Sequence, residues 1–107
     1  MPLTHDFKET ILARARRDAG FRHALLREAL ECLLNGDADT GRSVLRDYVN
    51  ATIGFAHLER STGIPEKSLM RMLGPKGSPS LTNLAAILTS LKKSEKVAFR
   101  VALEKAS

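Results

Sequence analysis

The sequence predicts an all-α fold, a compact helical domain of about six helices. Apolar residues recur at intervals of three and four along almost the whole chain, which is the period of an amphipathic helix. No stretch shows sustained alternation of apolar and polar residues, and β-branched residues are scarce. With 107 residues, of which 43% are hydrophobic, the chain can bury one modest core. We therefore expect a single domain over residues 1–107.

The N-terminal part, residues 1–52, is expected to hold three helices. The second of them ends where Gly36 favours a left-handed turn, and Thr40 or Asp39 is available as the N-cap of the third. The surplus apolar surface of these helices either pairs two protomers or holds a partner protein. The helices are expected at residues 6–18, after Gly20 from Phe21 to about residue 35, and at residues 40–52.

A tight glycine turn joins two short helices in the middle of the chain. The first is expected at residues 55–61, and Gly63 supplies the positive φ that the turn requires. Pro65 suits the first turn of the second helix, because the N–H that it lacks has no partner there. Two helices joined in this way are typical of a helix-turn-helix, whose second helix fits a DNA major groove. We therefore expect residues 54–91 to bind DNA.

The helix that begins near Pro65 is expected to turn its polar edge to solvent. Its apolar residues, Leu69 and Leu73 among them, face the core. Lysine and arginine side chains donate to guanine O6 and N7, and glutamate accepts from cytosine N4. The alternative is a carboxylate that complements the helix dipole beside two solvated basic side chains. The expected base-contacting residues are Glu66, Lys67 and Arg71.

The chain beyond this helix is expected to form a loop and two further helices. The loop over residues 74–79 contains two glycines and two prolines. Ser80 can cap a helix over residues 81–91, and Ser94 can cap a last amphipathic helix at residues 95–105 within a C-terminal segment over residues 94–107. The apolar residues of that last helix are Val97, Phe99, Val101 and Leu103.

The residues around the glycine turn carry a family resemblance. The segment SLMRMLGPKGSPS, followed by TNLAAIL and preceded by Leu58, Thr62 and Gly63, resembles the lambda-repressor-like helix-turn-helix of the XRE family. Within that family it is similar to the addiction-module antidote proteins of the HigA type. The resemblance covers about the C-terminal half of the chain. It implies a sequence-specific transcriptional regulator, a homodimeric repressor on a palindromic operator, and an antitoxin paired with a small toxin protein.

The resemblance also implies a set of phosphate contacts. Backbone N–H groups of the glycine loop and the ammonium of Lys76 would reach the DNA backbone. The alternative is an ordinary turn between packed helices. Glu59 stands where the family usually keeps a small alanine, so we expect its carboxylate to reach solvent or to pair with Arg60 or Arg71. The expected phosphate-contacting residues are Ser68, Lys76, Gly77 and Ser78.

Composition suits a polyanionic partner and argues against other classes of function. Seventeen Lys and Arg against twelve Asp and Glu give a formal charge of +5. No nucleophile elbow, carboxylate pair or P-loop is present, so we expect no enzymatic activity and no cofactor. His5, His23 and His57 lack the spacing of metal ligands, so no metal is expected either.

The compartment is inferred from cysteine usage and hydropathy. Cys32 is the only cysteine, lies in an apolar run and is expected to be a core thiol, and a lone cysteine excludes an intrachain disulfide. No apolar run approaches the ~20 residues that span a bilayer. The first ten residues lack the apolar region of a signal peptide. We expect a cytoplasmic protein that does not associate with membranes.

Two other classes of function remain open at this point. A protein-interaction module that neutralises a toxin without binding DNA would keep the helices and not need the groove-facing chemistry. An RNA-binding regulator is less well supported, because only 5% of the residues are aromatic and no stacking platform is evident.

Overall fold

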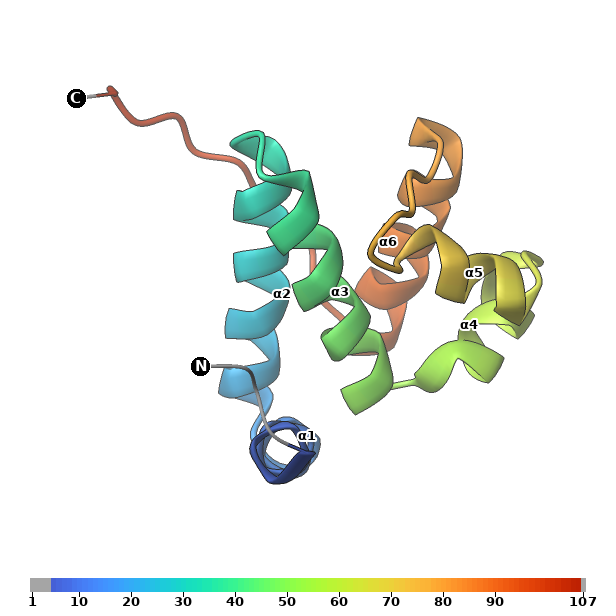
Figure 1. Cartoon of the computed structure of the whole chain (residues 1–107). Helices are drawn as coiled ribbons and strands as arrows, with labels where there is room; N and C mark the ends of the chain where they lie inside the picture. Colours follow the sequence, from blue (N-terminus) through green and yellow to red (C-terminus); the bar gives the residue numbers. More distant parts are fainter. Residues whose placement is uncertain (1–4, 107) are drawn as a thin grey trace.

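The computed structural model describes residues 5–106, and within them the chain forms six α-helices and no β-strand (Figure 1). The expected all-α fold is confirmed. Every helix predicted before residue 94 is present, with ends that differ by a few residues from those expected. The helices are α1 (His5–Arg17), α2 (Ala19–Leu34), α3 (Ala38–Ala51), α4 (Gly54–Thr62), α5 (Glu66–Met72) and α6 (Leu81–Glu95).

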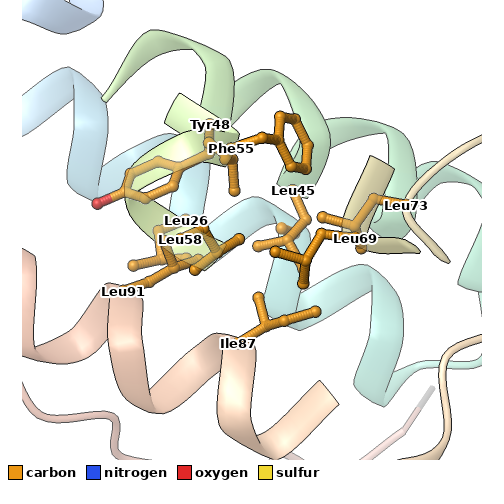
Figure 2. Close-up of a cluster of buried hydrophobic side chains, with 11 residues drawn as sticks. Leu26, Leu45, Tyr48, Phe55, Leu58, Leu69, Leu73, Ile87 and Leu91 are labelled. Atoms are coloured by element: carbon orange, nitrogen blue, oxygen red, sulfur yellow. The ribbon is translucent and has the colours of Figure 1, made fainter. Parts of the chain in front are cut away.

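The helices form two groups around one core. Helices α2 and α3 lie side by side as an antiparallel pair, with α1 across one end, and α4, α5 and α6 pack on the other side of α3 (Figure 1). Figure 2 shows that apolar side chains from both groups meet between them. Burying a leucine of this kind contributes about 1.5–3 kcal/mol. The buried cluster consists of Leu26, Ala29, Leu45, Tyr48, Val49, Phe55, Leu58, Leu69, Leu73, Ile87 and Leu91.

Side-chain caps begin three of these helices. Asp18 accepts from the Phe21 N–H at the start of α2, and Ser80 caps α6 as the sequence predicts. For α3 the cap is Asp37, whose Oδ1 lies 3.2 Å from the Thr40 nitrogen, so the expectation of Thr40 or Asp39 is wrong. The helix starts two residues earlier than predicted, because the capping side chain directly follows the Gly36 turn.

Glu95, at the end of α6, joins three helices. Its carboxylate accepts from the Tyr48 hydroxyl at 2.6 Å and from Arg22 Nε at 3.1 Å, and it lies 3.4 Å from His23 Nε2. Partial burial raises the pKa of Glu95, but the bonds from Arg22 and Tyr48 outweigh it and hold the pKa below its ordinary value. Burial and the bond to Glu95 raise the pKa of Tyr48. The charged carboxylate therefore ties α6 to α2 and α3.

The expected C-terminal helix is absent. Helix α6 continues through Ser94 to Glu95 and ends at Lys96, whose φ of 58° is left-handed, and residues 97–106 form no regular element. The prediction is wrong because the apolar residues from Val97 to Leu103 are spaced by two. On a helix that spacing distributes them around the axis instead of along one face. A spacing of two is typical of a strand and not of a helix.

Two further features bear on the expectations from composition. Cys32 is half-buried and not a core residue, and its Sγ lies 3.7 Å from Glu28 Oε1. Desolvation and nearby acidic groups raise the pKa of this thiol, which lowers its reactivity. Among residues 5–106 no helix is both long enough and apolar enough to cross a membrane.

Candidate nucleic-acid interface

The turn between α4 and α5 depends on Gly63. Its φ of 78° lies in the left-handed region, as predicted, and its N–H donates to the Glu59 carbonyl at 2.8 Å. The Thr62 hydroxyl donates to the Leu58 carbonyl and accepts from the Ile64 N–H at 3.2 Å. The N–H groups of Gly63 and Ile64 and the hydroxyl of Thr62 are thus engaged locally. The turn holds α4 and α5 in a fixed mutual orientation.

The side chain of Glu59 caps the start of α5. Its Oε1 accepts from the Glu66 N–H at 2.6 Å, and Glu59 is exposed. Of the two alternatives expected for this carboxylate, contact with solvent is therefore the one observed, and pairing with Arg60 or Arg71 is not. Pro65 is the residue just before the helix, with extended ψ of 140°, and its carbonyl accepts from the Leu69 N–H. It therefore stands one position earlier than predicted. A carboxylate from α4 supplies the cap that a proline cannot, and it does so at the positive end of the helix dipole.

Helix α5 has one buried face and one exposed face. Leu69 is fully buried, and Leu73 directly after the helix is 2% exposed. Lys67 and Arg71 are exposed, and Met70 between them is 43% exposed. Because residues four apart share a face, the two basic side chains lie along one edge. Of the three expected base-contacting residues, Glu66 is the one that is only half exposed.

The loop after α5 is fixed to α3 by Arg42. Its Nε donates to the Gly74 carbonyl at 2.7 Å, and one terminal nitrogen donates to the Pro75 carbonyl at 2.8 Å. The same nitrogen contacts Asp39 at 2.8 Å. The Nε and one terminal nitrogen of Arg42 therefore bond to other residues of the protein. The loop is held as part of the folded body at the end of α5.

Gly77 is required by close packing within this loop. A Cβ at this position would overlap the carbonyl oxygens of Arg71 and Met72. The Gly77 N–H also donates to the Gly74 carbonyl at 2.9 Å. This N–H is engaged and does not point a free donor at a ligand, in contrast to the expectation from the resemblance. The loop's ordinary packing role explains Gly77.

The other expected phosphate-contacting residues are accessible to different degrees. Lys76 and Ser78 are exposed, and Ser68 is half-buried on α5. No hydrogen bond or ion pair engages the side chains of Lys67, Arg71 or Lys76 in the part of the chain that the structure describes. By contrast, Arg22 and Arg42 are bound internally. Helix α5 and the loop that follows it therefore present three exposed cations whose side chains have no partner in the described chain.

The positive charge of the chain is concentrated in one segment. Residues 60–94 contain six Lys and Arg and a single acidic residue, Glu66, whereas the remaining residues contain eleven of each sign. Residues 60–94 thus carry the whole formal surplus of +5, and they run from the end of α4 through α5 and the loop to the last turn of α6, just before Glu95. All six of its basic residues are exposed: Arg60, Lys67, Arg71, Lys76, Lys92 and Lys93.

The roles of three residues of this region did not follow from the sequence. Met70 is exposed between the two cations of α5. Arg42 anchors the loop after α5 to α3. The capping role of Glu59 had a signal in its position, seven residues before the first N–H of the next helix, but a reach across a turn is not a periodic pattern.

Comparisons with known proteins neither support nor oppose the family resemblance. No protein-family model matches the chain, and neither the curated proteins nor the solved structures gave a significant match. The exposure and contacts of α5 and the loop after it are therefore the basis for the function of this surface.

Proposed function

We propose that this chain is a sequence-specific DNA-binding transcriptional regulator that inserts α5 into the major groove. One observation carries the proposal: a short helix is anchored by Leu69 on one face and turns the unpaired cations Lys67 and Arg71 to solvent on the other. A rigidly held helix edge with exposed donors suits the reading of base edges. The charge distribution is a second support, because residues 60–94, which include α5 and the loop after it, hold six basic residues and one acidic residue.

Each side chain of the edge has a matching base chemistry. Lys67 and Arg71 donate to guanine O6 and N7, and Glu66 accepts from cytosine N4. Met70 adds an apolar contact for a thymine methyl group. Each well-formed pair of this kind is worth about 1–3 kcal/mol of discrimination between bases. Glu59 caps the first turn of α5, and the Gly63 turn fixes the direction of α5 relative to α4. The helix therefore holds these side chains in a defined position.

The backbone of the DNA is held by the loop and by the start of the helix. Lys76 supplies an ammonium, and Ser68 and Ser78 supply hydroxyl groups to phosphate oxygens. We leave Gly77 out of this set, because its N–H is already bonded. Arg42 of α3 fixes the start of the loop directly after α5, so the loop that carries Lys76 and Ser78 is held beside the helix that carries the base contacts.

The biological setting rests on the family resemblance. We infer a cytoplasmic homodimer that represses its own promoter and is the antitoxin of a toxin-antitoxin pair, with a small toxin as its protein partner. A palindromic operator would place the two copies of α5 one DNA turn apart, about 34 Å. The interaction surface for the toxin would lie on the helices before α4.

Footprinting of the purified protein on DNA upstream of its own gene tests the proposal. Protection of an inverted repeat, lost in a Lys67→Ala and Arg71→Ala double variant, is the expected result. A matched control is Arg16→Ala and Arg17→Ala, which removes two exposed cations from α1. A protein that binds no DNA at low salt, and yet binds the product of the neighbouring gene, would instead be a pure interaction module.

A further inference from the structure

The last ten described residues expose a regular apolar pattern. The exposed fraction rises along the segment, from half-buried Val97 through Phe99 at 36% and Val101 at 70% to Leu103 at 95%. No backbone hydrogen bond engages residues 98–106 within the described chain. Figure 1 shows that the end of the chain extends beyond the helices. An extended segment with free backbone groups and one apolar face has the character of an unpaired strand.

We propose that residues 99–105 pair with the same residues of a second copy as two antiparallel strands centred on Ala102. In an antiparallel pair related by a twofold axis, residues equally far from the centre lie opposite each other. With Ala102 at the centre, Arg100 of one copy faces Glu104 of the other, and this pair occurs twice. Val101 likewise faces Leu103 on the opposite side of the ribbon.

The choice of a second copy as the partner follows from this self-complementarity. Opposite charges directly across from each other stabilise a strand pair, and like charges destabilise it. A register centred one residue earlier, on Val101, would face Arg100 with Ala102 and leave every charge without a partner. The sequence thus favours one register of pairing with itself. A strand of unrelated sequence would not in general place both opposite charges and apolar side chains across from those of this segment.

The ribbon needs support from the helical bodies. A two-stranded ribbon is marginal in water unless its apolar face packs on something. Val97 and Phe99 are the better buried members of the alternating set, so each strand starts against its own protomer. Val101 and Leu103 leave that body and are the residues that a second protomer would cover. Pairing also removes an exposed strand edge that otherwise favours aggregation.

This inference deepens the proposed function, since it names the surface that forms the homodimer. It rests on that proposal only for the existence of a dimer and not for DNA binding. The tests below are therefore made without DNA, so that a monomeric protein and a dimer that ignores DNA give different results.

Cysteine cross-linking tests the register. In a Cys32→Ser background, Ala102→Cys places two thiols directly opposite each other, at a Cα separation within the range of a disulfide. Ala98→Cys is the matched control, because it lies on the same face of the strand but about 26 Å from its symmetry mate. We expect a covalent dimer from Ala102→Cys under mild oxidation and none from Ala98→Cys. Equal cross-linking of both variants would overturn the proposal.

Charge exchange tests the pairing itself. Arg100→Glu or Glu104→Arg alone sets like charges opposite each other twice, and should raise the dimer dissociation constant on the order of tenfold or more. The double variant Arg100→Glu with Glu104→Arg restores opposite charges and should restore the dimer. Light scattering during size-exclusion chromatography measures both. The helical circular dichroism signal should stay constant, because the segment lies outside all six helices.

Two outcomes would reject the interface. A wild-type protein that remains monomeric at about 100 µM removes the need for it. A dimer that persists unchanged in both single charge variants and in Val101→Asp with Leu103→Asp would place the contact elsewhere, for example on the N-terminal helices.

Discussion

At the scale of single residues, one side chain of α5 holds the helix in the core, and other side chains are available to a ligand. Leu69 is buried and fixes the helix, whereas Lys67 and Arg71 keep their charges in water and have no partner in the described chain. Lys76 differs from them because it stands on the loop and not on the helix. A cation on a rigid helix edge can select a base, and a cation on a loop suits the phosphate backbone.

The first prediction separates these two roles. Arg71→Ala should weaken binding to the preferred operator by about 1–3 kcal/mol and relax the preference at one base pair. Lys76→Ala should weaken binding to all sequences about equally and lower the salt slope by roughly one. Titration of a set of single-base operator variants at several salt concentrations measures both effects. If the two variants changed every probe alike, the assignment of roles would be wrong.

The second prediction concerns the cap at Glu59. Glu59→Ala removes the acceptor for the Glu66 N–H and should lower the free energy of unfolding by about 0.5–2 kcal/mol. Glu59→Gln keeps an oxygen in the same place and should lose less. Urea denaturation followed by circular dichroism gives the two values. Equal losses would mean that the carboxylate acts only through its charge.

At the scale of elements, the helices were predictable where a local rule decides them. Gly63 and Ser80 follow the rules for a left-handed turn and for an N-cap, and the structure has them in those roles. The segment after Glu95 was mispredicted because its apolar content was counted while the spacing of two was overlooked. The anchoring of the loop by Arg42 was not predictable, because it joins residues 32 positions apart through a side chain.

The candidate site was likewise predictable only where a local rule decides it. The exposure of Lys67 and Arg71 followed from helical periodicity and is observed. The engaged N–H of Gly77 could not be inferred, since a glycine in a loop reads equally well as a phosphate contact or as a close packing position. The contact of Lys67 and Arg71 with DNA remains a prediction.

The third prediction compares two turns with the same backbone strain. Gly63 and Gly36 have φ of 78° and 90°, and a Cβ at either would meet nothing within 4 Å. Alanine at either position should therefore cost about 1–2 kcal/mol of stability from the left-handed conformation alone. Only Gly63→Ala should also weaken DNA binding, because that turn sets the direction of α5. Thermal unfolding and operator titration of both variants make the comparison.

The fourth prediction concerns acid stability through Glu95. Its pKa is lowered in the folded protein, so its contribution is present above the ordinary value of 4.5 and is lost as the pH falls through the folded pKa. The Phe21 N–H lowers the pKa of Asp18, and hydrogen bonds from the Thr40 side chain and the Thr40 N–H lower the pKa of Asp37, so both groups act in the same direction. Glu95→Gln should therefore be less stable at pH 7 and have a shallower, not flat, decline in acid. Urea unfolding between pH 3 and 7 measures how the free energy of unfolding depends on pH. The same pH dependence in Glu95→Gln as in the wild type would show that Glu95 does not contribute to acid stability.

At the scale of the whole molecule, charge and packing are divided between the two halves. The acidic and basic residues outside residues 60–94 balance, and several are used internally, as in the contact of Arg22 with Glu95. The segment from α5 to α6 keeps its cations exposed. A shared core, to which α2, α3, α4, α5 and α6 all contribute, makes the balanced half a rigid support for the charged one.

The fifth prediction distinguishes a local interface from general attraction by net charge. Reversing Lys67 and Arg71 to Glu, or Arg16 and Arg17 to Glu, lowers the formal charge from +5 by the same amount. At physiological salt, screening acts over about 8 Å, so exposed charges on α1 contribute little to a contact made at α5. The first pair should lower operator affinity on the order of a hundredfold or more, since it removes two base contacts, while the second should change it only a few-fold. Comparable losses in both variants would show that the protein binds DNA as a diffuse polycation, without a reading helix.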